Sequence, residues 1–197
     1  TRGFMNGANK KETTPYEPEI SSYDYDAPLD EAGNPTEKFR VFRSVIARHL
    51  PPGDTLPPVP PAKPAIAIDS IRFTASENLG DVLSDPVASD QPLTFEDLKQ
   101  AYGYVWYRTT LQGGRPGTLR IDALRDYAVV MVNGVRAGVL DRRLAQDSMQ
   151  LTLPAGKDTL DILVENLGRI NFGPELLRNR KGITRQGLFR GQPLHGW

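Results

Sequence analysis

A series of short apolar runs separated by turn signals occupies the second half of this chain and limits the folds open to it. Apolar and polar residues alternate in GTLRIDAL, SMQLTL and TLDILVEN, with the period of a half-buried strand. Asn133-Gly134 stands between two further apolar runs and favours a tight type I′ hairpin. Many short strands with such turns predict a mainly β chain, folded as an antiparallel jelly-roll sandwich.

One clear helix precedes these strands, between Pro35 and Leu50. We expect Asn34 to cap it, Pro35 to take its first position and Glu37 to complete a capping box. From Phe39 onward its apolar residues recur at helical spacing and form a stripe. Because nothing local can cover this stripe, the sequence predicts that the helix packs against another part of the protein.

A proline-rich stretch, residues 51–66, follows the helix and favours an extended, semi-rigid linker. We expect residues 67–92 to form a connecting β segment and residues 93–197 to form the sandwich. Near the start of the sandwich, Thr94 and Asp97 form a capping pair, which predicts a short helix from Thr94 to Tyr102.

Composition excludes several classes of protein. The chain has 24 lysines and arginines against 24 aspartates and glutamates, so it lacks the basic excess that nucleic-acid or membrane-surface binding needs. It has no cysteine, which excludes a disulfide scaffold and a thiolate metal site. No apolar run is long enough to span a bilayer, and no motif indicates a cofactor.

The stretch SSYDYDAPLDEAG, residues 21–33, is the main candidate for chemistry. Asp24 and Asp26 are spaced like a catalytic pair. However, we expect so acidic a turn to be exposed to solvent, and a catalytic pair needs one desolvated member with a raised pKa. We expect these carboxylates to hold the turn by accepting backbone N–H groups. No Asp-x-Asp-x-Asp-Gly pattern is present, so we expect no metal site. The aromatic rings of Tyr23 and Tyr25 suit either stacking on a sugar or packing on the helix.

Two groups of motifs resemble one known family. FMNGAN and SSYDYDAPLDEAGNPTEKFRVFRSVI resemble the segment that closes the catalytic barrel of glycoside hydrolase family 35 β-galactosidases. PLTFEDLKQAYGYVWYRTTL, DYAVVMVNGVRAGVLDR and LDILVENLGRINFG resemble the β-domain that follows this barrel. The resemblance implies that residues 1–50 are the last loop and helix of a truncated (β/α)8 barrel. It also implies that residues 93–197 are a galactose-binding-like jelly roll, truncated at its C-terminal end.

The resemblance further implies hydrolysis of terminal non-reducing β-D-galactose with retention, by two glutamates that precede Thr1, so that this chain holds no catalytic residue. By motif match, Tyr25 contacts galactose, and Tyr23, Phe4 and Asn6 lie on the same rim. The implied partners are a β-galactoside or galactose and the missing catalytic barrel of the same polypeptide. Such enzymes act on extracellular or periplasmic sugars.

Two other functions stay open at this point, because a galactose-binding-like fold does not establish a sugar site. One is a non-catalytic carbohydrate-binding module, and the other is an interaction domain that docks a protein through the helix stripe. The chain begins at Thr1 and ends at Trp197 in the approach to another strand. We therefore expect it to be a fragment of a longer protein.

Overall fold

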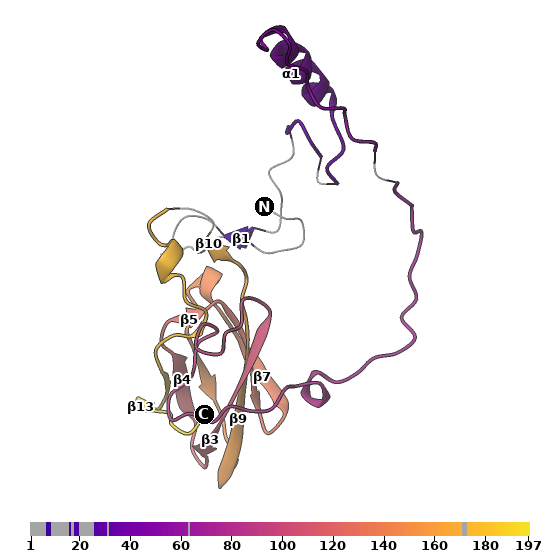
Figure 1. Cartoon of the computed structure of the whole chain (residues 1–197). Helices are drawn as coiled ribbons and strands as arrows, with labels where there is room; N and C mark the ends of the chain where they lie inside the picture. Colours follow the sequence, from indigo (N-terminus) through magenta and orange to yellow (C-terminus); the bar gives the residue numbers. More distant parts are fainter. Residues whose placement is uncertain are drawn as a thin grey trace. The chain divides into compact units, whose positions relative to one another are not determined.

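The computed structural model describes residues 7–8, 16, 18–19, 26–30, 32–62, 64–170 and 173–197. The chain divides into two compact units, which are described separately. One holds Ile20–Asp85, and the other holds Asn6–Glu19 together with Pro86–Trp197 (Figure 1).

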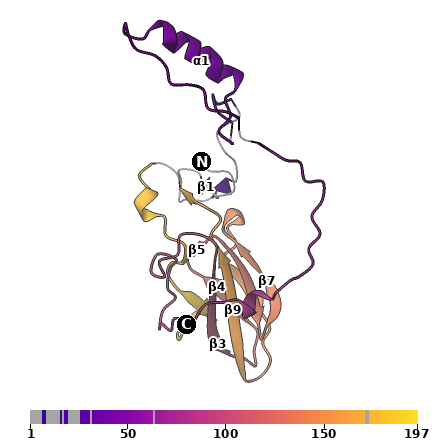
Figure 2. The same cartoon turned by 45° about the vertical axis from the view of Figure 1, so that its right-hand side comes forward.

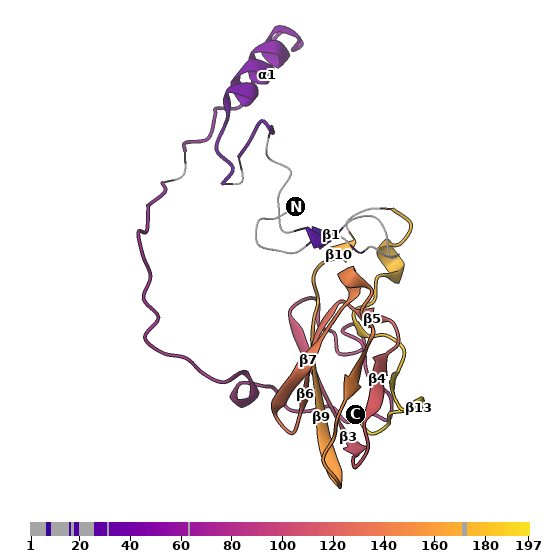
Figure 3. The ribbon, with the colours of Figure 1, turned by 180° about the vertical axis from the view of Figure 1, so that it is seen from behind.

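The second unit is built on two antiparallel four-stranded sheets, one on each side of a shared core (Figures 1 and 3). The first has the order β3-β9-β6-β7, and the second has the order β13-β12-β4-β8. The strands of the first are β3 (Tyr104–Gln112), β9 (Lys157–Glu165), β6 (Tyr127–Val132) and β7 (Val135–Asp141). Those of the second are β13 (Gln192–Pro193), β12 (Gly187–Phe189), β4 (Gly117–Ile121) and β8 (Ser148–Leu151). The expected antiparallel sandwich is confirmed.

Apolar side chains from both sheets fill the space between them. On β9 the inward residues Leu160, Ile162 and Val164 alternate with outward ones, as the sequence period predicts. These residues join one core, whose fully buried members on other strands are Leu119, Ile121, Ala128, Val130, Leu140 and Ile183. Burial of this apolar surface is the main stabilising term of the unit.

The hairpin between β6 and β7 is the predicted type I′ turn. Asn133 has φ 50° and Gly134 has φ 77°, and this turn type needs a positive φ at both positions. The Asn133 side chain also ties the turn to β9, because its Oδ1 accepts from the Thr159 N–H at 2.8 Å.

The described residues also form two small sheets and three 3-10 turns. One sheet pairs β5 (Leu124–Arg125) with β11 (Gly182–Ile183), and the other has the order β10-β1-β2. Figure 2 labels β5 of the first of these sheets and β1 of the second. In the latter, β1 (Gly7–Ala8) runs parallel to β10 (Arg169–Ile170) and antiparallel to β2 (Pro18–Glu19). The 3-10 turns are η1 (Leu79–Asp81), η2 (Arg142–Leu144) and η3 (Leu176–Arg178).

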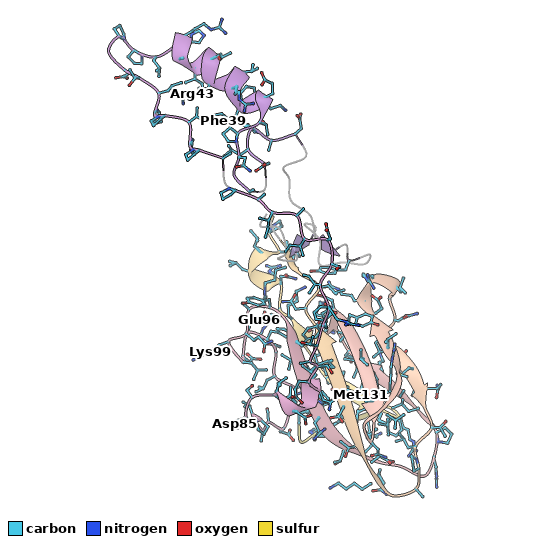
Figure 4. All side chains as sticks on the ribbon, turned by 90° about the vertical axis from the view of Figure 1, so that its right-hand side faces the viewer. Phe39, Arg43, Asp85, Glu96, Lys99 and Met131 are labelled. Atoms are coloured by element: carbon cyan, nitrogen blue, oxygen red, sulfur yellow. The ribbon has the colours of Figure 1, made fainter. Side chains whose placement is uncertain are left out.

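The prediction of a helix from Thr94 to Tyr102 is wrong, although the capping pair of Thr94 and Asp97 is present. Asp97 accepts from both the N–H and the hydroxyl of Thr94, at 3.0 and 2.8 Å. The chain then makes only hydrogen-bonded turns over residues 95–99. Lys99 adopts a left-handed φ of 57° and the Gln100 N–H bonds back to the Phe95 carbonyl, a pattern that ends a helix after one turn. Glu96 and Lys99 mark this turn in Figure 4.

In the first unit, helix α1 (Glu37–Arg48) is confirmed, but its cap is Thr36 rather than Asn34. The Thr36 Oγ1 accepts from the Phe39 N–H at 3.5 Å, whereas the Asn34 side chain bonds to Asp30. None of the helix residues is buried in this structure. Its apolar face includes Phe39 (Figure 4) and the exposed Val41, Phe42, Val45 and Ile46.

The β segment expected over residues 67–92 is absent. The structure assigns no strand between residues 64 and 92, and Ile66 and Phe73 are 85% and 90% exposed. A strand needs a neighbour for its N–H and C=O groups, and none of the described strands pairs with this stretch. Its apolar alternation alone is therefore insufficient to form a strand here.

Candidate functional site

The residues expected to face a sugar are Tyr25, Tyr23, Phe4 and Asn6, and all four lie outside the described residues. The same holds for Asp24. Their expected roles stay predictions, and the described part of the same loop begins at Asp26.

The acidic residues that follow in this loop form hydrogen bonds and an ion pair with nearby residues. Asp30 accepts from the Asn34 N–H at 2.7 Å and from the Asn34 side-chain amide at 3.1 Å. The backbone bond from Asn34 holds the pKa of the Asp30 carboxyl below its ordinary value. Asp26 is paired with the Lys38 ammonium on helix α1. Both acids are exposed, so neither lies in the apolar surroundings in which a general acid is usually found.

Thr36 fastens this loop to the start of the helix. Its hydroxyl lies 2.9 Å from the Pro28 carbonyl and 3.1 Å from the Ala27 carbonyl, and its own N–H bonds to Pro28. A bridge between Leu29 and Pro35 closes the turn. The described loop is thus held by its own polar groups. Asp26, expected to accept a backbone N–H, pairs with Lys38, and Asp30 is the acid that accepts the N–H of Asn34.

A buried ionic cluster lies at the end of the sandwich where β10 and β1 pair. Asp126 is fully buried, and its carboxylate accepts from the Lys181 ammonium at 2.7 Å and from the Arg142 guanidinium at 2.8 Å. The Leu167 N–H adds a third bond at 3.1 Å. Lys181 is 0% exposed and Arg142 is 8% exposed, so the charges are desolvated and held by each other.

Tyr16 completes this cluster from a distant part of the sequence. Its hydroxyl accepts from the Lys181 ammonium at 2.7 Å and donates to the Gly168 carbonyl. The Arg142 guanidinium lies over its ring, 3.9 Å from the centroid. The electron-rich ring face is a favourable partner for a desolvated cation. We call Tyr16, Asp126, Arg142 and Lys181 together the Tyr16 anchor.

Neighbouring contacts fix the backbone that carries Lys181. Its N–H donates to the Glu96 carboxylate at 3.1 Å, and Glu96 also pairs with Arg169 at 2.6 Å. Gly182 follows with φ 98°, and a Cβ there would lie 2.2 Å from the Tyr107 hydroxyl. Only glycine lets the chain pass this close while Lys181 turns toward Asp126.

Sequence reasoning missed the Tyr16 anchor, because its successive members are separated by 16 to 110 positions and share no motif. The sequence holds one weak indication that Lys181 is buried. Lys181 and Gly182 directly precede an apolar residue in a strand-like run, and a solvated lysine is unusual at such a position. Tyr107 and Trp106, by contrast, have structural roles. The Tyr107 hydroxyl donates to the Leu93 carbonyl at 2.7 Å, and the Trp106 indole donates to Asp161 at 2.8 Å.

The described residues offer no cluster of three or more His, Cys, Asp or Glu side chains that could hold a metal ion. In the same part of the chain, no helix has the length and apolar character needed to cross a membrane.

Comparison with known proteins shows which family this fold belongs to. Residues 92–197 match the family described as "Beta-galactosidase, first all-beta domain", and residues 1–49 match "Glycosyl hydrolases family 35". The sandwich is therefore an all-β domain of the class carried by glycoside hydrolases, joined to the end of a family 35 domain. The chain belongs to the family 35 β-galactosidases.

Curated relatives agree along nearly the whole chain. The beta-galactosidase of Xanthomonas manihotis is 44% identical over 197 residues, and that of Mus musculus is 41% identical over 206. Beta-galactosidase 1 of Dictyostelium discoideum is 36% identical over 219 residues. These alignments cover 98–99% of this chain but only 30–33% of each relative. The chain thus spans about a third of the length of the relatives it matches.

Proposed function

We propose that this chain forms part of an enzyme that hydrolyses terminal non-reducing β-D-galactose with retention, to which it supplies a substrate-facing loop and a supporting β-domain. One observation carries the proposal: consecutive parts of the chain match the family 35 domain and the first all-β domain of β-galactosidases, in that order. In this proposal the nucleophile and the general acid come from residues outside the chain.

Tyr25 is the proposed galactose contact, with Tyr23, Phe4 and Asn6 around it. The described acids of the same loop support this division of roles. Asp26 and Asp30 are exposed and engaged with Lys38 and Asn34, so they are poor candidates for an acid/base pair. The aromatic side chains of the loop are left as the groups suited to a sugar ring.

The first test uses the chain itself. We expect purified residues 1–197 to release no aryl group from an aryl β-galactoside, because both catalytic carboxylates are proposed to lie elsewhere. The longer enzyme that contains this chain serves as the positive control at the same molar concentration. Turnover by the purified chain above the buffer rate would contradict the proposed placement of the catalytic groups.

The second test concerns Tyr25 in that longer enzyme. Tyr25→Phe keeps the ring and removes one neutral hydrogen bond, so kcat/KM should fall by about 2- to 12-fold, or about 0.5–1.5 kcal/mol. Tyr102→Phe is the matched control, because Tyr102 is 71% exposed on the β-domain. Equal kinetics for Tyr25→Phe and the wild type would mean that the hydroxyl does not contact the sugar.

A further inference from the structure

One row of side chains crosses the outward face of the β3-β9-β6-β7 sheet and belongs to neither the core nor the Tyr16 anchor. Tyr104 pairs with Glu165, Glu165 pairs with Tyr127, and Tyr127 pairs with Asp141. Cross-strand partners project to the same side of a sheet, so these four side chains lie next to one another. Their neighbours along each strand are buried in the core, so the row points away from it. We call it the Glu165 row.

Arg143 is held beside this row in a fixed orientation. Its Nε donates to one oxygen of Asp141 at 3.0 Å, and its Nη2 donates to the other at 2.6 Å. This two-point contact fixes the plane of the guanidinium, while Nη1 still carries two N–H donors. The bond to Asp141 raises the pKa of the guanidinium, and the nearby Tyr127 and Glu165 raise it further. A cation of fixed orientation therefore lies within charge interaction of the Glu165 carboxylate.

Glu165 and Arg143 attract each other without forming an ion pair. Arg143 is ion-paired with Asp141, and no cation of the described residues is ion-paired with Glu165. Tyr104 faces the same carboxylate, because partial burial and then Glu165 raise the pKa of its hydroxyl. Tyr104 is 52% exposed, and the Arg143 side chain is 47% exposed. Solvent therefore reaches an aromatic ring and a hydrogen-bond donor beside a half-buried acceptor.

We propose that the Glu165 row, together with Arg143, binds a neutral saccharide. A sugar hydroxyl is both a donor and an acceptor, so one ligand can donate to the Glu165 carboxylate and accept from the Arg143 guanidinium. The exposed ring of Tyr104 offers a surface on which the apolar face of a pyranose can stack. Glu165 repels an anion and Arg143 repels a cation, which favours an uncharged ligand.

The small apolar surface on this face also favours a small ligand over a protein. The next row of the same face consists of the half-buried Trp106, Leu163, Val129 and Val139, one from each strand. Neighbouring strands are about 4.8 Å apart, so this row is about 15 Å long and one side chain wide. A stable protein–protein interface buries about 800 Å² on each partner, which is far more than this row offers.

The two tryptophans of the chain give the test an internal comparison. Trp106 lies in the row next to the Glu165 row, whereas Trp197 packs against the core and meets the ring of Tyr107 edge-on. Each indole N–H gives its own signal in a proton–nitrogen correlation NMR spectrum. The purified chain of residues 1–197 is titrated with galactose, with lactose, and with sorbitol as an open-chain polyol that has no ring to stack.

Three variants of the same chain test the named groups. Tyr104→Ala removes the ring, Tyr104→Phe keeps it, and Glu165→Gln removes the charge but keeps the shape. Asp147→Asn is the matched control, because Asp147 is a half-exposed carboxylate paired with Arg120 of the opposite sheet. Thermal melting of each variant confirms that it is folded. Tyr104→Phe and Glu165→Gln preserve size, so the test does not depend on the folding of Tyr104→Ala.

We expect galactose and lactose to shift the Trp106 signal and the backbone signals of the Glu165 row saturably, with a dissociation constant of about 1–10 mM. The Trp197 signal should stay in place, and sorbitol should shift neither indole. Tyr104→Ala and Glu165→Gln should weaken binding by about fivefold or more, and Tyr104→Phe by less than about twofold. Asp147→Asn should bind like the wild type.

Several results would overturn the site. They are the absence of a saturable shift up to about 100 mM sugar, shifts centred away from the Glu165 row, an equal response to sorbitol, and equal affinity in all folded variants. Shifts of the Trp106 signal that follow protein concentration instead of sugar concentration would assign the face to a second copy of the chain. The titration measures no turnover, so its failure leaves the proposed hydrolysis untouched.

Discussion

The carboxylate of Asp161 accepts three hydrogen bonds on the outward face of the β3-β9-β6-β7 sheet. They come from the Trp106 indole at 2.8 Å and from the Arg108 guanidinium at 2.7 and 3.2 Å. The Asp161 side chain is only 2% exposed although Arg108 is 65% exposed, so the arginine and the tryptophan cover it. Asp161→Ala removes the acceptor and leaves a half-buried indole N–H without a bond. We expect the free energy of unfolding in urea to fall by about 1–3 kcal/mol.

Asp147→Ala is the matched control for that substitution. Asp147 also pairs with an arginine, Arg120 at 3.3 Å, but both side chains are about half exposed. An exposed ion pair contributes little, so we expect a loss below about 1 kcal/mol. Similar losses for Asp147→Ala and Asp161→Ala would contradict the burial argument.

The β6-β7 hairpin is the element whose conformation depends most directly on one residue. At Gly134, φ is 77° and a Cβ added there would meet no atom within 4 Å. Gly134→Ala therefore tests backbone strain without steric overlap, and the left-handed conformation should cost about 1–2 kcal/mol. We expect the sandwich to unfold at a lower urea concentration by that amount, with its far-ultraviolet spectrum unchanged.

Gly53→Ala provides the comparison for the hairpin substitution. Gly53 has φ 98° and equally open surroundings, so its strain is similar, but it lies in the other compact unit. The sandwich transition should not move in this variant. A shift as large as that of Gly134→Ala would show that the two units unfold together, which would contradict their separate compactness.

The elements that the sequence predicted correctly are those with strong short-range signals. Asn133-Gly134 specifies its own turn, and the alternation in β9 identifies the core face directly. The predictions that fail concern conformations that depend on contacts with other residues. Lys99 ends the turn that starts at Thr94, and Asp30 bonds to Asn34, so that Thr36 caps the helix. None of the described strands pairs with residues 67–92. At the candidate site, Asp26 pairs with Lys38 instead of accepting a backbone N–H, and Asp30 takes that role with Asn34. Lys181 and Tyr16 could not be paired, because nothing local connects positions so far apart.

At the scale of the whole molecule, carboxylates with lowered pKa values link folding to pH. The Arg143 guanidinium bonded to Asp141 holds the pKa of that carboxyl below its ordinary value of 3.8. The Thr94 N–H does the same for Asp97. Burial alone raises the pKa of Glu96, but the Lys181 N–H and the Arg169 guanidinium outweigh it, so the net change from 4.5 is downward. These three groups bind protons more weakly in the folded chain than in the unfolded one.

Their contribution to stability is therefore fully present above their unfolded values, near pH 5, and is lost as the pH falls through the folded values. We expect the free energy of unfolding in urea to be level from pH 7 to about pH 5 and to decline steadily below about pH 4. Asp97→Asn keeps an oxygen for the Thr94 bonds but cannot titrate, so its profile should decline less steeply over that range. A wild-type profile that stays level down to pH 2 would contradict the folded-state pKa directions. A variant profile parallel to the wild type would assign the decline to Glu96, Asp141 and other acids instead of Asp97.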